Sequence, residues 1–247
     1  MQLINDIIKK QLISMVFKYK PTDKMAGLID DNIMLLMVMS RFGMSLGFGD
    51  KTVQEVCSTQ HVDCNTFLAV ANFISSDQSS YSTDQIPQFS IASLMEYLKN
   101  AHSYFLEFNF PLLRRKLIEA IDCSTSNNVA FLMLKFFDEM VHNVRAHMEF
   151  ENTEIFTYVT QLLQGKTSDK INITKFARKH PQIEDKVSEL KNIIIKYYPE
   201  CSNDNLLNAV LFDIFNCEQD LASHRQVEEC LFVPAVAQLE KQLQNEQ

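Results

Sequence analysis

Apolar residues recur at the spacing of an α-helix from residue 91 to the C-terminal region. One such stripe contains Met133, Phe137, Met140, Val144, His147 and Glu151. A second contains Val210, Ile214, Cys217, Leu221, His224, Glu228 and Leu231. Each set falls on one face of a helix with 3.6 residues per turn, and each face carries a histidine and a glutamate near its end.

The period predicts four long helices joined by short connections. They cover residues 91–121 with a kink at Pro111, 128–159, a stretch from Asn172 that ends before Pro199, and 203–240 with a disturbance at Pro234. Proline removes a backbone donor and clashes with the preceding turn, which is why it is expected to bend these helices. The lengths favour an up-down-up-down four-helix bundle.

Upstream of the bundle, the pattern predicts a small helical domain. A polar, serine-rich segment over residues 75–88 is typical of a linker, so we expect domains at 1–80 and 86–247. Within the first, an apolar helix over 30–42 is followed by glycines, a helix capped by Asp50 or Thr52, and a helix over 63–74.

Composition supports an all-α protein and excludes several partners. The chain has only 5 glycines and 6 prolines, whereas sandwiches and barrels need many turns. A net charge of −8 argues against binding to nucleic acid or to an anionic membrane surface. The order of residues 52–70 resembles a helix-turn-helix, but Lys51 is the only cation between Met44 and Ile74.

We expect a cytoplasmic protein without a membrane span. The N-terminus lacks a signal-peptide core, and the apolar run 33–39 is too short to cross a bilayer. The six cysteines show no CxxC spacing, so they are expected to stay reduced, most of them as packing residues of the core.

A histidine–glutamate motif occurs twice at matched spacing. His147 and Glu151 form one HxxxE pair, and His224 and Glu228 form the other. On a helix, residues four apart project from the same face. His102 precedes the first pair by 45 residues and His180 precedes the second by 44.

These six residues are expected to meet in a shared pocket at one level of the bundle. In an antiparallel bundle the start of one helix lies beside the end of the next. His102 is early and His147 late in the first pair of helices, and His180 and His224 repeat this order. Pro181 disfavours helix at His180, which leaves that residue either at the rim of its helix or at a kink.

Four imidazoles and two carboxylates suit two metal ions. A carboxylate buried alone in a core is costly to ionise, and a dication reverses that cost. Imidazole with carboxylate and no thiolate suits iron, manganese or zinc. We expect two histidines per ion, Glu151 and Glu228 between the ions, and open positions for O2, NO or water.

Other polar residues are weaker candidates. His142 lies five residues before His147 and should face away from it, and His61 belongs to a turn. Asp220, one turn before His224, could orient a ligand. The six cysteines lack the setting of a cysteine nucleophile, and no classical hydrolase or transferase site is indicated.

On these residues the chain resembles the repair-of-iron-centres family of hemerythrin-like di-iron proteins (the YtfE/ScdA type), over nearly its full length. The resemblance implies a small N-terminal domain and a hemerythrin-like bundle with two non-haem irons. It implies the ligands His102, His147, Glu151, His180, His224 and Glu228, with the glutamates bridging. The family's N-terminal domain usually carries adjacent cysteines before a glycine, where this chain has Ser45-Leu46-Gly47.

The resemblance implies a role in nitrosative or oxidative stress, through repair of damaged iron–sulfur proteins or donation of iron. The alternative is a protein that binds or senses O2 or NO and signals to a partner. A homodimer is a further expectation. The missing cysteine pair rules out a thiol-dependent step at that place.

Overall fold

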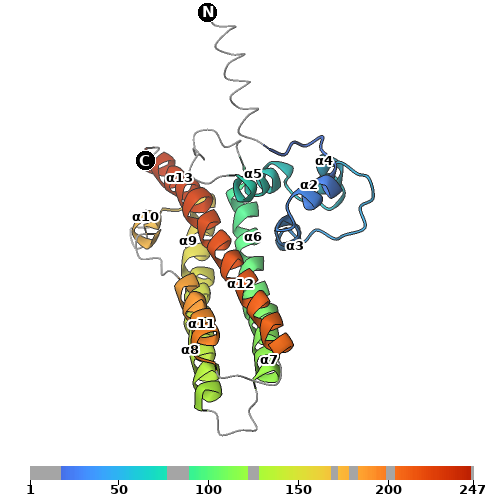
Figure 1. Cartoon of the computed structure of the whole chain (residues 1–247). Helices are drawn as coiled ribbons and strands as arrows, with labels where there is room; N and C mark the ends of the chain where they lie inside the picture. The colour runs from blue at the N-terminus through green and yellow to red at the C-terminus, as the bar shows by residue number, and fades with distance from the viewer. Residues whose placement is uncertain are drawn as a thin grey trace, which may run out of the picture. The chain divides into compact units, whose positions relative to one another are not determined.

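The structure, a computed structural model, describes residues 18–76, 89–121, 128–167, 172–177, 183–198 and 204–245 (Figure 1). Every regular element within these ranges is a helix, which confirms the all-α class. Most of the predicted linker lies outside the described residues, as do His180, Pro181, Cys123 and Cys201. Among the described residues, contacts group those up to Asn100 with 227–238 as one compact unit, and those from Ala101 to Gln226 with 239–245 as another.

The N-terminal helices are α2 (Met25–Asp31), α3 (Leu35–Arg41), α4 (Val53–Thr59) and α5 (Cys64–Ser75). The prediction of one helix over 30–42 is wrong, because the backbone at Asn32 is extended and its Oδ1 accepts a hydrogen bond from Met34 N at 3.0 Å. Thr52 caps α4 as predicted, in a reciprocal capping box with Glu55.

Two features of this domain bear on function. Residues Thr66–Phe73 of α5 are all buried, so this helix has no free face with which to enter a DNA groove. The N-terminal helices also contact the next helix, α6 (Ile91–Ser103), at residues shortly before His102. Asn100 Nδ2 donates to Arg41 O at 2.8 Å, and the rings of Phe42 and Tyr97 lie 4.9 Å apart.

Three of the four predicted long helices are present and each is interrupted, whereas the third is described only in two parts, with residues 178–182 outside the described ranges. The first run consists of α6, a π-helix η3 (Tyr104–Asn109) and α7 (Phe110–Ala120). The second consists of α8 (Asn128–Phe150), η4 (Glu151–Ile155) and α9 (Phe156–Leu163). The third contributes α10 (Ile173–Ala177) and α11 (Ile183–Tyr197). The fourth consists of α12 (Asp204–Val227), η5 (Glu228–Phe232) and α13 (Val233–Asn245).

The helices were predicted to be disturbed at Pro111 and Pro234, but the interruptions are π-helices that lie just before these prolines. The irregular turns precede Pro111 and Pro234, and each proline sits in the first turn of the following α-helix. A proline ring clashes with the carbonyl four residues before it, and the wider turn of a π-helix moves that carbonyl away. The second run has the same interruption without a proline, so proline is not the common cause.

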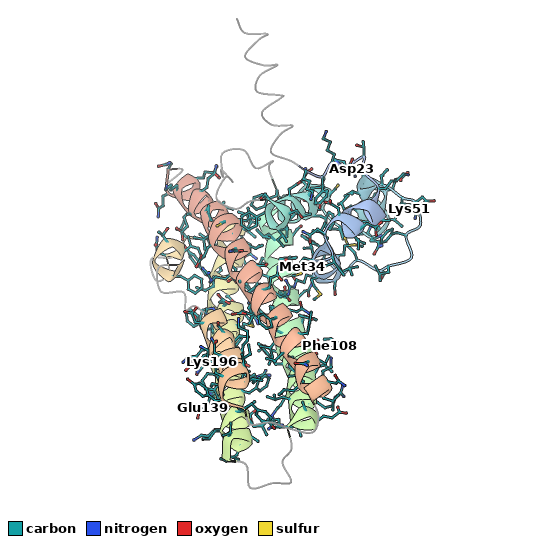
Figure 2. All side chains as sticks on the ribbon, viewed as in Figure 1. Asp23, Met34, Lys51, Phe108, Glu139 and Lys196 are labelled. Carbon is teal, nitrogen blue, oxygen red and sulfur yellow. The ribbon has the colours of Figure 1, made fainter. Side chains whose placement is uncertain are left out.

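Away from these interruptions, four helices of the second unit enclose an apolar core. Its residues include Leu113 and Leu117 of α7, Met133 and Phe137 of α8, Leu190 and Ile194 of α11, and Val210 and Ile214 of α12. α8 and α11 lie side by side (Figure 1). Glu139 and Lys196 are exposed on the outer surface of these helices (Figure 2). The helical period therefore predicted the inner face correctly.

Candidate metal centre

His102 lies near the end of α6 and is completely buried. Its Nε2 lies 3.1 Å from Nε2 of His224, which comes from α12. Two imidazoles that are 122 positions apart in sequence thus direct the same ring nitrogen at one another. This is the contact between the two halves of the sequence that the repeated motif predicted.

The two glutamates of the HxxxE motifs are buried beside these imidazoles. Glu151 is 1% exposed and Glu228 is 4% exposed. Glu151 Oε2 lies 3.4 Å from His102 Nε2, and its other oxygen lies 3.2 Å from His147 Nε2. Glu228 follows His224 by one turn of the same continuous helical run. One ligand atom from each of His102, Glu151, His224 and Glu228 lies within 4.8 Å of the other three.

Each described π-helix begins at or just after one of these residues. η4 starts at Glu151 and η5 at Glu228, while η3 starts two residues after His102. A π-turn inserts an extra residue into the helix and changes the direction of the side chains that follow. Such turns are frequent at functional sites, and here three of them coincide with the buried polar cluster.

Aromatic rings fix the two imidazoles from their apolar sides. The ring of Phe156 stacks on His102 with centroids 5.6 Å apart and planes 15° apart. Phe105 meets His224 edge to face at 5.8 Å. Both phenylalanines are buried. Apolar rings therefore flank both imidazoles, so that water competes little for their ring nitrogens.

The donor set fits a divalent cation. Two ligand atoms bound at about 2.1 Å to one ion lie roughly 3.0–3.4 Å apart, for angles between a right angle and the tetrahedral value. The 3.1 Å separation of the two Nε2 atoms is in this range. Two carboxylates buried together repel each other, and a cation between them converts that repulsion into attraction.

Four of the six predicted residues, His102, Glu151, His224 and Glu228, are thus brought together. His147 joins them through Glu151, and its side chain is 12% exposed. His180 lies outside the described residues. His142 is exposed, as expected.

The two remaining expectations concern Asp220 and the cysteines. Asp220 is buried, and its predicted role of orienting a ligand stays a prediction. Of the cysteines described, Cys57 and Cys217 are buried, whereas Cys230 is exposed and is not a packing residue.

Sequence reasoning missed Asn152. Its Oδ1 lies 2.9 Å from His102 Nδ1. In a regular α-helix the residue after Glu151 would point about 100° away from it. The only sequence signal was its place directly after the HxxxE motif.

Comparison with known families agrees with this cluster. The model of the hemerythrin HHE cation-binding domain matches residues 93–236, more than half of the chain. The chain belongs to the hemerythrin HHE cation-binding family. The matched range contains every residue of the buried cluster. A comparison with curated proteins gave no match. Among the described residues, no helix has both the length and the apolar character needed to cross a membrane.

Proposed function

We propose that the bundle holds two non-haem iron ions and that their ligands are His102, His147, Glu151, His180, His224 and Glu228. The convergence of two imidazoles and two carboxylates in a buried cluster carries this proposal. Iron fits the set because it accepts both imidazole and carboxylate ligands; manganese or zinc would fit the same donors. Glu151, which contacts both His102 and His147, is well situated to bridge the ions.

When bound, the ions would supply a redox-active Lewis-acid centre for a small ligand such as O2 or NO. The protein's own residues have four tasks there. The imidazoles and carboxylates hold the ions and balance their charge. Phe105 and Phe156 orient the rings and limit the access of water.

Repair of damaged iron–sulfur proteins, or donation of iron to them, in the cytoplasm during nitrosative or oxidative stress is the proposed biological role. Its support is the resemblance in residue spacing, which extends over both predicted domains. Ser45, Leu46 and Gly47 occupy the place of the family's cysteine pair. Any repair by this chain therefore has to proceed without thiols at that place.

Binding or sensing of O2 or NO is the second candidate, and the burial of the cluster favours it. Each of His102, Glu151, His224 and Glu228 is at most 4% exposed, and His102 is at 0%. A diatomic molecule can reach such a centre through small fluctuations, whereas a protein client cannot touch it without local opening. Transfer of iron to a client requires that opening.

The first experiment measures the metal in the aerobically purified protein. We expect about two irons per chain, with an optical spectrum that changes on addition of NO. His147→Ala should lower the iron content and alter the spectrum, whereas His142→Ala, on the exposed face of the same helix, should change neither. Folded protein that purifies without stoichiometric metal would contradict the proposal and indicate a structural helical module.

A second experiment separates the two candidate roles. The iron-loaded protein is incubated with an enzyme whose iron–sulfur cluster has been damaged by NO, and the activity of that enzyme is followed. Recovery that depends on iron-loaded protein and is absent with His147→Ala supports repair. Reversible NO binding without recovery contradicts repair and supports sensing.

A further inference from the structure

The His102 ring is held at both of its nitrogens by consecutive residues of η4. Nδ1 lies 2.9 Å from Oδ1 of Asn152, and Nε2 lies 3.4 Å from Oε2 of Glu151. Glu151 and Asn152 are the first two residues of the π-turn η4, and their side chains contact opposite nitrogens of the same ring.

The contact with Asn152 determines which ring nitrogen carries the hydrogen. A carboxamide oxygen only accepts hydrogen bonds, so Nδ1 must be the donor. In a neutral imidazole the other nitrogen, Nε2, then carries the lone pair. This nitrogen is the one directed at His224 and Glu151, where the lone pair is needed to bind a cation.

We propose that Asn152 is a positioning residue that keeps His102 in the Nδ1–H tautomer and thereby makes its Nε2 a metal ligand. The inference rests on the proposed metal site and adds to it a residue outside the ligand set. Partners of this kind orient metal-bound histidines, and their loss typically lowers metal affinity about 10–100-fold.

The second half of the sequence differs at the matching place. The residue after Glu228 is Glu229, a carboxylate where the first half has an amide. A carboxylate acceptor makes an imidazole more electron-donating than an amide does. The amide at 152 therefore makes His102 a weaker donor than an aspartate in its place would.

Three variants of the full-length chain test the proposal, with Co²⁺ as the probe and a competing chelator to measure affinity. Asn152→Leu removes the acceptor at similar size and should weaken Co²⁺ binding by about 10–100-fold. Asn152→Asp keeps an acceptor and should bind Co²⁺ at least as tightly as the wild type. Thr153→Ala is the matched control, because Thr153 is exposed in the same π-helix and bonds to Glu149 O.

A second readout works without metal. In the long-range ¹H–¹⁵N spectrum of the metal-free protein, assigned with His102→Gln, Nδ1 of His102 should carry the hydrogen. Asn152→Leu should shift this hydrogen to Nε2 in a large part of the molecules, and Thr153→Ala should not.

The two readouts separate this inference from the proposed function. A wild-type protein that binds no Co²⁺ contradicts the metal site, and the metal-free spectrum still tests the contact. The inference is overturned if Nδ1 of His102 carries no hydrogen in the wild type. It is also overturned if Asn152→Leu binds Co²⁺ with an affinity within twofold of the wild type. The inference is supported if Asn152→Leu binds Co²⁺ more weakly than the wild type and Asn152→Asp does not.

Discussion

The two ends of the bundle are built by the same helical runs but differ in the side chains that they bury. At one end, regular α-helices bury a continuous apolar core that includes Leu117, Phe137 and Ile194. At the other end, π-turns interrupt the runs where His102, Glu151, His224 and Glu228 meet. The apolar end gains stability from the area it buries, whereas the polar end has to compensate for buried charge.

This difference shows what each end requires of its side chains. An apolar core tolerates changes that keep volume and pattern. A cluster of ligands has to direct particular atoms to one point, and small errors in direction are costly. The π-turns at Glu151 and Glu228 change that direction locally while leaving the neighbouring α-helices intact. Stability at the polar end should therefore depend on metal, and stability at the apolar end should not.

Glu151→Gln should have the largest effect on the polar end. It removes the charge that contacts both His102 and His147, and we expect Co²⁺ binding to weaken by more than about 100-fold. At a Co²⁺ concentration 1,000 times the wild-type Kd, the wild type should gain about 4 kcal/mol of unfolding free energy, most of which the variant should lose.

Without metal, Glu151→Gln should differ from wild type by no more than about 1 kcal/mol, because a buried carboxylate contributes little to stability without its cation. Thermal unfolding with and without Co²⁺ measures both quantities. An equal Co²⁺-dependent stabilisation in the variant and the wild type would show that Glu151 is no ligand.

Phe137→Ala tests the apolar end. Phe137 is 1% exposed in the core, and its truncation should cost about 3–5 kcal/mol of unfolding free energy, measured in urea. Phe131→Ala on the same helix should cost less than about 0.5 kcal/mol, since that ring is 70% exposed. Should Phe137→Ala not fold, Phe137→Leu gives a smaller loss in the same direction.

Co²⁺ affinity of the folded Phe137 variant should stay within about threefold of wild type, because distant sites behave independently. A large loss of affinity would mean that the two ends are coupled.

A smaller effect is expected at the buried pair of Tyr158 and Glu240. The Tyr158 hydroxyl donates to Glu240 Oε1 at 2.6 Å, and Ile173 N donates to the same oxygen at 3.1 Å. Burial, and then the bond to Glu240, raise the pKa of Tyr158 above its usual value. Tyr158→Phe should cost about 1–2 kcal/mol near neutral pH.

The raised pKa also gives this pair a pH dependence. Because the folded-state pKa exceeds the unfolded one, the stabilisation is present below about pH 10, the ordinary tyrosine pKa, and is lost as the pH rises above it. The difference in unfolding free energy between wild type and Tyr158→Phe should therefore shrink above pH 10. A difference that grows with pH would contradict the assignment. Co²⁺ affinity should change little, since neither residue belongs to the ligand cluster.

Much of the fold could be predicted from the sequence. The apolar period identified the inward faces of α8 and α12, because burial selects residues at that spacing. The break at Asn32 was missed, because a local side-chain bond interrupts a stretch whose apolar pattern continues.

The candidate site was predictable in part. The HxxxE repeat led to Glu151, His224 and Glu228 because residues four apart share a helix face, and His102 was found by its matched spacing before the first motif. The π-turns were not predictable, since one extra residue per turn leaves no mark in composition and η4 has no proline. Asn152 was missed because it lies outside the HxxxE spacing, and its contact with His102 within the π-turn is visible only in the structure.

Anomalous diffraction at the iron edge, from crystals of the aerobically purified protein, shows directly whether the buried cluster holds iron. We expect two iron peaks, one of them within bonding distance of Nε2 of both His102 and His224, with Glu151 and Glu228 as ligands. An iron-free cluster in which these side chains only bond to one another, or metal peaks elsewhere in the chain, would contradict it.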